Sequence, residues 1–158
     1  MKPAETKILR DLMEMQEIAA LGTLHNGEPF VSMVPFAIVR GSADFVIHVS
    51  QLAAHTKDML LSPQVSLLIV APPAPDVSAQ ATARATIQGH ARPCAASSEG
   101  HAGAKAAYLA RFPDSAGMFE FADFSLFLIR PTSIRLVGGF AQARTLAPEA
   151  FAEALSRG

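Results

Sequence analysis

Hydroxyl, imidazole and ammonium groups gather where a predicted strand gives way to a predicted helix, within the stretch from Asp44 to Leu61. The residues are Ser50, His55, Thr56 and Lys57. Unpaired amides and the helix dipole at a helix N-terminus favour negative charge, and Lys57 adds a cation. The combination suits a phosphate group. An ordinary turn whose side chains cap the helix would use the same residue types.

The other candidate side chains predict no catalytic residue. No pair among the five histidines has a spacing typical of a metal site; they are His25, His48, His55, His90 and His101. His48 alternates with Val46 and Ser50 on a strand, where a packed imidazole is more common than a catalytic base. Cys94 is the single cysteine, and we expect an unreactive thiol. No acid–base pair stands out.

The composition predicts one globular domain over residues 1–158. Half of the residues are hydrophobic and the net charge is −1, which suggests neither nucleic acid nor an anionic membrane as a partner. A lone cysteine excludes an internal disulfide framework and fits the reducing cytoplasm. Acidic residues interrupt the first sixteen positions, so we expect no signal peptide, and no stretch approaches the length of a membrane-spanning helix.

The first part of the chain shows a helical period, then alternation, then a return to the helical period. Apolar residues recur at helical spacing in the first segment, and His25-Asn26-Gly27 has the composition of a hairpin turn. The expected elements are a helix over 3–15, strands over 18–24, 28–39 and 45–50, and a helix over 52–61. Pro35 cannot donate a ladder hydrogen bond, so the second strand should have an edge, a bulge or a ligand there.

The second part of the chain predicts a buried strand, a proline-rich loop and a long strand with one polar face. These are 65–70, 71–79 and 80–91, followed by a helix over 95–111, strands over 124–129 and 133–137, a break at Gly138-Gly139-Phe140, and a helix over 148–156. Two of these strands are apolar on both faces. One face should fill a barrel, and the other should meet helices or a second subunit.

These elements predict a mainly β fold with peripheral helices. Six or seven strands joined by short turns favour an antiparallel barrel, from about residue 17 to 145, over a doubly wound parallel sheet. No G-x-G-x-x-G or P-loop motif follows a strand. The doubly apolar strands predict a homodimer.

Four segments, taken in order, resemble the pyridoxamine-phosphate-oxidase-like, FMN-binding split-barrel family. They are ALGTLHNGEPFVSMVPFA, FVIHVSQLAAHTKDMLLSPQVSLLI, ARATIQGHARP and DFSLFLIRPTSIRLVGGFAQA. The combination of L-A-x-H-T-K, S-P-x-V-S-L-L and a later D-F near G-G-F looks most like the branch linked to haem utilisation. The resemblance spans residues 17–145.

The resemblance implies a split-barrel homodimer with FMN between the subunits. The strand from Ser32 to Phe36 would lie along the flavin ring, largely through backbone groups, and His48 to Ser50 would contact the flavin or its phosphate. Thr56 and Lys57 would hold the phosphate with His55 beside them, and Arg84 would reach the flavin. The implied cofactor contacts are Ser32, Met33, Val34, Pro35, Phe36, His48, Val49, Ser50, His55, Thr56, Lys57 and Arg84. Five of these residues also have an ordinary explanation: Lys57 and Arg84 as exposed charges, and Ser50, His55 and Thr56 as helix caps.

Some positions depart from the family pattern. Thr56 stands where the oxidases have an arginine, which removes one fork-shaped donor for the phosphate. The C-terminal arginine and histidine that bind substrate in true pyridoxamine phosphate oxidases have no match, so we expect a different substrate. The haem-linked branch often carries a further C-terminal region with haem contacts, and we expect it to be missing here because one short helix follows Leu146.

Three functions remain open, in this order. The first is an FMN-dependent oxidoreductase with a small-molecule substrate or electron donor, in which the protein binds and orients the flavin. The second is a haem-binding or haem-degrading protein on the same barrel, for which any of the five histidines could bind the iron. The third is a dimeric module without a cofactor. Fold alone does not separate the three.

Overall fold

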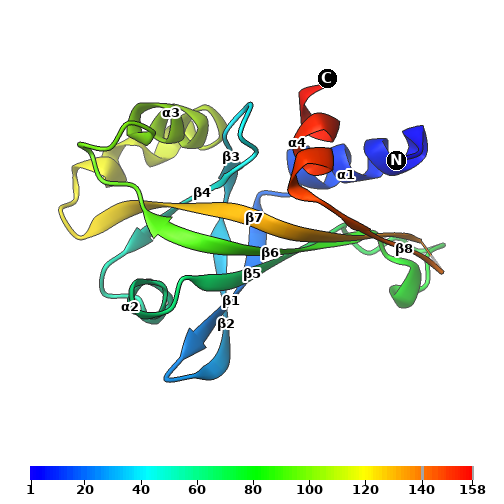
Figure 1. Ribbon diagram of the computed structural model, residues 1–158, viewed down its shortest axis with the longest axis horizontal. Helices are drawn as coiled ribbons and strands as arrows, with labels where there is room; N and C mark the ends of the chain where they lie inside the picture. Colours follow the sequence, from blue (N-terminus) through cyan, green and yellow to red (C-terminus); the bar gives the residue numbers. More distant parts are fainter. Residues whose placement is uncertain (140, 158) are drawn as a thin grey trace.

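The computed structural model describes residues 1–139 and 141–157 (Figure 1). Eight strands form one sheet: β1 Ile18–His25, β2 Glu28–Pro35, β3 Ala37–Ile38, β4 Phe45–Ser50, β5 Gln64–Val70, β6 Arg84–Pro93, β7 Phe124–Gly139 and β8 Gln142–Leu146. The helices are α1 Pro3–Met15, α2 Ala54–Leu61, α3 His101–Arg111 and α4 Pro148–Ser156, with 3-10 turns η1 Ala79–Ala81 and η2 Pro113–Glu120.

The strand order forces the sheet to curl. Neighbours run β2-β1-β5-β6-β7-β4-β3, every pair is antiparallel, and β8 adds to β7. β2 and β3 lie at opposite ends of this order, yet Phe36 alone separates them in the chain. A single residue reaches only a few ångströms, so the two edges of the sheet must approach each other. The mainly β split-barrel fold predicted from the sequence is confirmed.

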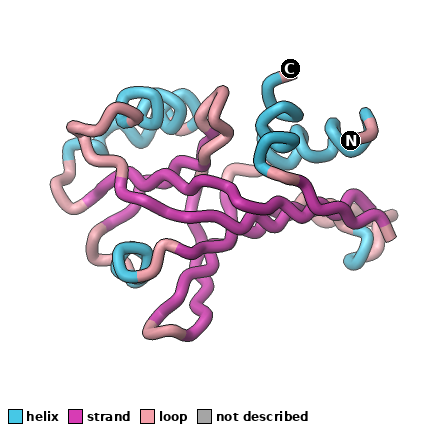
Figure 2. Tube along the Cα trace, in the orientation of Figure 1, coloured by secondary structure: helices cyan, strands magenta, loops and turns pink. Residues whose placement is uncertain are grey.

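Two hydrophobic cores lie on the two faces of the sheet. Inside the curl, alternate strand residues pack with α1 and α4, and the set includes Leu9, Leu21, Leu67, Ile87, Ile129 and Phe151. On the other face, α3 and η2 cover the β4–β7 end, with Val46, Ala104, Tyr108, Leu126 and Leu128. β4 and the start of β7 contribute to both cores, which explains why residues 45–49 are all buried and why the sequence of 124–129 is apolar on both faces. α1 and α4 lie together beside β7 and β8 (Figure 2).

Arg111 ties the two sides of the molecule together. From the end of α3 its guanidinium donates hydrogen bonds to the carbonyls of Met13 (2.7 Å) and Gln16 at the end of α1, and it lies 4.8 Å from the centre of the Phe36 ring. Cationic donors stabilise the exposed carbonyls of a helix C-terminus. This side chain therefore links the C-terminal ends of α1 and α3 just before β1 begins.

Several expected boundaries differ from the structure. The helix expected over 52–61 begins at Ala54, and the helix over 95–111 begins at His101, because Ser98 donates to the carbonyl of Ala95 and closes a turn. The strand over 80–91 begins at Arg84, whose guanidinium donates to two carbonyls of the preceding η1 turn. The strand over 28–39 divides at Phe36 into β2 and β3, since its amide pairs with Glu17 outside the ladder.

The end of the sheet also differs from the prediction. The expected strands 124–129 and 133–137 are one continuous strand, β7, because a register shift opposite Gln88 and Gly89 accommodates Pro131, which has no amide hydrogen. The chain then returns as β8, an additional strand that raises the number to eight. Phe140, the last residue of the expected break, lies outside the described residues.

Within the described ranges, no helix is both long enough and apolar enough to cross a membrane.

The bulge gives a prediction about stability. A Cβ on Gly89 would lie 2.6 Å from the carbonyl oxygen of Arg130 and 2.9 Å from Cγ2 of Ile129. Gly89→Ala should therefore lower the free energy of unfolding by about 1–3 kcal/mol in urea titrations. Gly103→Ala is the matched control, since a Cβ there meets no atom within 4 Å, and the helix should gain up to about 1 kcal/mol. Equal effects of the two substitutions would contradict the explanation.

Candidate functional site

A buried carboxylate joins the β1–β2 hairpin to α2. Asp58 is only 4% exposed, and its two oxygens accept hydrogen bonds from the hydroxyl of Thr23 (2.8 Å) and Nδ1 of His25 (2.7 Å). Burial by itself would raise the pKa of Asp58, but these two hydrogen bonds, together with the charge interactions of His25 and His55, outweigh burial and hold the pKa below its usual value. The carboxylate therefore stays ionised, and it fixes the position of α2 against the hairpin.

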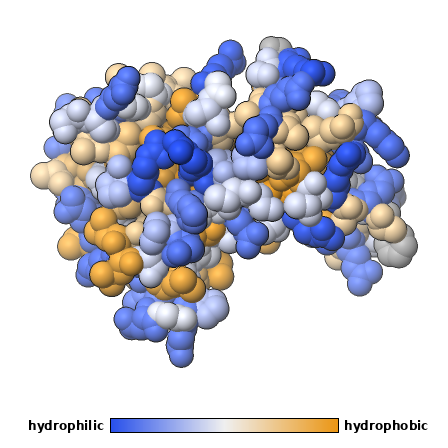
Figure 3. All heavy atoms as spheres, viewed as in Figure 1, coloured by the Kyte–Doolittle hydropathy of each residue, from blue (hydrophilic) through white to orange (hydrophobic). Residues whose placement is uncertain are grey.

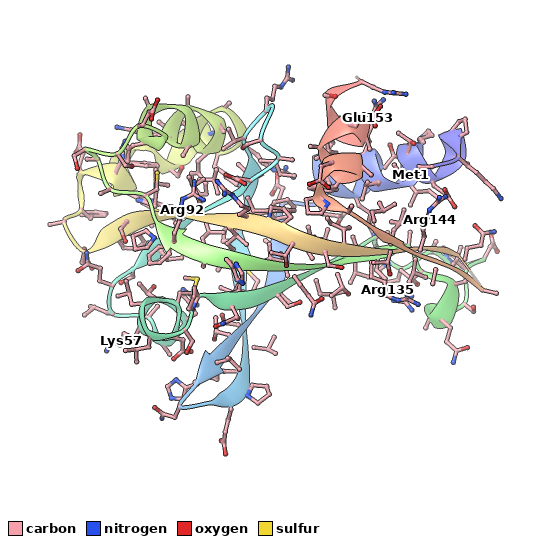
Figure 4. The ribbon with its side chains drawn as sticks, in the orientation of Figure 1. Met1, Lys57, Arg92, Arg135, Arg144 and Glu153 are labelled. Atoms are coloured by element: carbon pink, nitrogen blue, oxygen red, sulfur yellow. The ribbon has the colours of Figure 1, made fainter. Side chains whose placement is uncertain are left out.

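The N-terminal turn of α2 makes two further polar contacts. Nδ1 of His55 lies 2.9 Å from the hydroxyl oxygen of Ser32 on β2, so the predicted contacts Ser32 and His55 do meet. The Thr56 hydroxyl, 1% exposed, donates to the carbonyl of Ser50 at 2.6 Å, and it serves the strand–helix turn. Lys57 is exposed and points away from the sheet (Figure 4). Of the predicted phosphate pair, Lys57 is therefore the accessible member.

The other predicted contacts on β2 and β4 divide between the surface and the core. Met33 is 57% exposed on β2, and Pro35 is half-buried. Val34, Phe36 and Val49 are buried in the main hydrophobic core. Only the backbone groups of these three residues could meet a cofactor. That is compatible with the predicted contact along the flavin ring, which was expected through backbone groups, and the structure leaves that prediction untested.

His48 lies in an aromatic cluster beneath α3 and η2. Its ring stacks on Phe119 with centroids 4.0 Å apart and an interplanar angle of 8°, and Tyr108 and Phe124 pack around it. Burial lowers the pKa of His48, and the Lys105 ammonium lowers it further. The packed histidine that the sequence favoured is what the structure describes.

Arg84 lies apart from α2 within the chain. Arg84 pairs with Val70, at the end of β5 that is farther from α2. The length of β5 therefore separates Arg84 from the C-terminal end of α2 by roughly 20 Å. There it lines a cavity of about 550 Å³ together with Val77, Thr82 and the proline-rich loop. One protomer therefore does not bring Arg84 to Lys57.

Sequence reasoning missed His25, Thr23 and Asp58 as members of this site. His25 was assigned to a hairpin turn, and Asp58 was not singled out among the residues of the short helix. No local motif links them, because thirty-three positions separate the two partners of the hydrogen bond. Only the docking of α2 against β1 brings them together.

A curled antiparallel sheet with a polar corner between its first hairpin and its short helix defines a split-barrel protein of the pyridoxamine-phosphate-oxidase-like class. Residues 3–153 match the CREG beta-barrel family, and the chain belongs to that family.

Three similar proteins show how far the likeness extends. The noncanonical haem oxygenase HOZ, chloroplastic, of Arabidopsis thaliana is 39% identical over 119 residues, which are 75% of this chain and 35% of HOZ. The structure of a haem-binding protein from Mycobacterium smegmatis superposes with a TM-score of 0.84 and 28% identity over 97% of this chain and 62% of that protein. HutZ, a haem storage protein of Vibrio cholerae, superposes with a TM-score of 0.69 and 25% identity over 78% of this chain and 87% of HutZ. The chain thus spans about a third of HOZ and less than two thirds of the mycobacterial protein.

The burial of His48 predicts a pH dependence of stability. Because its pKa in the folded protein is lowered, the unfolded chain binds more protons once the pH falls below the unperturbed value of about 6.5. The contribution of His48 should be fully present above that value and decline as the pH falls through the lowered pKa. His48→Phe preserves the stacking and should lose less stability between about pH 7 and pH 5 in urea titrations. His90→Phe, at an exposed position on β6, is the control and should depend on pH as the wild type does. A stability of His48→Phe as pH-sensitive as that of the wild type would contradict the prediction.

Proposed function

We propose that this protein binds haem on its split barrel. The observation that carries the proposal is the similarity to proteins named for haem binding, haem storage and haem oxygenation, which for the mycobacterial protein covers nearly the whole chain. The sequence ranked an FMN-dependent oxidoreductase first, and these relatives favour the second hypothesis instead. A bound haem would supply an iron centre for redox or oxygen chemistry, and the chain would supply its ligand and its pocket.

The corner between the hairpin and α2 has groups that fit haem, an apolar macrocycle with two carboxylates. Leu61 is 85% exposed at the end of α2, and Leu52, Leu60 and Phe30 are further exposed apolar side chains of this region. Figure 3 shows hydrophobic atoms gathered over α2. Exposed leucines of this extent on one short helix are typical of a surface that is covered by a ligand or a partner. Lys57 provides a cation for a carboxylate.

FMN remains the second candidate, because Lys57 and the first amides of α2 form the kind of helix N-terminus that binds phosphate. The Thr56 side chain has no charge, and its hydroxyl donates to the carbonyl of Ser50. The positive charge at this turn therefore comes from Lys57. Thr56 replaces the arginine fork of the oxidases, so we expect weaker binding of the FMN phosphate than in the oxidases.

We also propose that a second copy of the chain covers the outer face of β1, β2 and β5. Ala20 pairs with Met33 on one side and Leu68 on the other, and Ile18, Val31 and Val70 are further exposed apolar residues of these strands. An apolar sheet face of this kind is normally buried against another sheet or a helix. A homodimer would bury it and place both cofactor sites near the subunit interface.

Absorption spectra test haem against FMN. Purified protein should develop a Soret band on titration with haemin and retain it through desalting, whereas FMN should be lost on the same column. Retained flavin bands with haemin removed by desalting would restore the FMN hypothesis. With ascorbate and dioxygen added, loss of the Soret band would indicate a haem-degrading enzyme, and a persistent band would indicate a haem carrier.

A charge on the outer face tests the dimer. Met33→Glu places a carboxylate in the proposed interface and should convert a dimer to a monomer in analytical ultracentrifugation, because an unpaired buried charge is strongly unfavourable. Phe121→Glu changes an equally exposed apolar residue outside that face and should leave the dimer intact. A wild-type protein that sediments only as a monomer would exclude the proposed interface.

A further inference from the structure

The hydrogen bond between His25 and Asp58 selects one tautomer of the imidazole. An ionised carboxylate can only accept hydrogen bonds, so Nδ1 of His25 must carry the proton that it shares with Asp58. The Thr23 hydroxyl donates to the other oxygen of the same carboxylate, so both oxygens of Asp58 act as acceptors. In neutral His25 the lone pair is therefore on Nε2, the nitrogen that faces away from the bond with Asp58.

The imidazole of His25 is held in place and is also accessible. Asp58 is itself fixed by the Thr23 hydroxyl, and the ring of Phe30 lies 5.5 Å from the ring of His25, centroid to centroid. The side chain of His25 is 49% exposed, at the end of a hairpin that projects from the sheet (Figure 1). Histidines that bind metals usually donate their other ring N–H to a carboxylate or carbonyl, which fixes the orientation of the ring and increases its basicity.

The corner around His25 presents exposed apolar and cationic side chains, the two kinds of group that a haem with propionates requires. On α2, Lys57 and Leu61 are four residues apart and so lie on one side of the helix, next to the side that carries Asp58. Both are exposed, as the Phe30 ring also is in part. An apolar macrocycle with its iron above His25 could meet Phe30 and Leu61 and direct a propionate toward Lys57.

The other four histidines differ from His25 in the described part of the chain. His48 is enclosed by aromatic rings, and His55 pairs with the hydroxyl of Ser32. A hydroxyl can donate or accept, so it does not fix the tautomer of His55. His90 and His101 have no carboxylate within hydrogen-bonding distance among the described residues. His25 therefore combines accessibility with a carboxylate partner at Nδ1, so Nε2 is the ring nitrogen that can face a ligand.

We propose that His25 is the axial ligand of a haem iron, through Nε2, and that Asp58 is its positioning residue, held in turn by Thr23. The inference rests on the proposed haem binding and assigns its ligand. The hydrogen bond from Nδ1 to an ionised carboxylate gives the imidazole partial anionic character. This strengthens the bond to ferric iron and lowers the reduction potential of the haem.

Spectroscopy of the haem-loaded protein tests the ligand. His25→Ala should lose the histidine-ligated ferric spectrum, raise the dissociation constant for haemin at least about tenfold, and recover the wild-type spectrum on addition of imidazole. His25→Gln can still hydrogen-bond to Asp58 and keeps the hairpin anchored, so it separates loss of the ligand from loss of folding. His101→Ala, a histidine outside this corner, should behave as wild type.

The role of Asp58 needs a readout that a purely structural residue would not change. Asp58→Asn should weaken haemin binding roughly 10–100-fold. It should also lower the iron–histidine stretching frequency of the ferrous form in resonance Raman spectra and raise the reduction potential. Thr23→Val removes the hydrogen bond that holds Asp58. It should change the stretching frequency and the reduction potential in the same directions as Asp58→Asn, but by less. Circular dichroism confirms that each variant is folded.

The outcomes test the assignment of His25 as the iron ligand separately from the proposal that the protein binds haem. Haemin binding by the wild type with an unchanged spectrum in His25→Ala and His25→Gln would overturn the assignment of His25 and leave haem binding standing. Absence of any haemin binding by the wild type would overturn both. An unchanged stretching frequency and potential in Asp58→Asn would overturn the positioning role of the carboxylate.

Discussion

The ionised carboxylate of Asp58 is the constraint on which the candidate site depends. A buried charge is tolerated only when its hydrogen-bonding capacity is satisfied, and two donors from β1 meet that need. The same two bonds dock α2 against the first hairpin, and docking places the exposed residues of α2 beside that hairpin. One electrostatic requirement thus sets the position of the helix, the orientation of an imidazole and the composition of the surrounding surface.

The split barrel offers three different environments around a single sheet. The inside of the curl is filled by α1, α4 and alternate strand residues, and the β4–β7 end of the outer face is filled by α3. The β1–β2–β5 part of the outer face has exposed apolar side chains instead. This distribution separates parts of the chain that stabilise the monomer from parts available for a ligand or a second copy.

Local sequence signals were sufficient for most of the fold. The helix over residues 3–15 and the hairpin at Asn26-Gly27 were predictable because their periodicity and turn composition are intrinsic to the segment. The continuity of β7 was not, since it depends on a register shift in the neighbouring strand that accommodates Pro131. The exposure of Lys57 followed from its place on the helix. The pairing of His25 with Asp58 required the three-dimensional docking of two distant segments, and Arg84 lies where only knowledge of the register of β5 and β6 could place it.

The order of strands in the sheet has a consequence for how the chain is made. β4 is synthesised early and is buried on both faces in the folded protein, but its long partner β7 comes near the end of the chain. During translation, β4 can pair only with the two-residue β3 until β7 has been synthesised near the end of the chain. Non-local pairing of this kind slows folding and leaves a sticky segment exposed meanwhile. The feature that lets one strand contribute to two cores in the folded protein therefore leaves both faces of β4 uncovered until β7 has been synthesised.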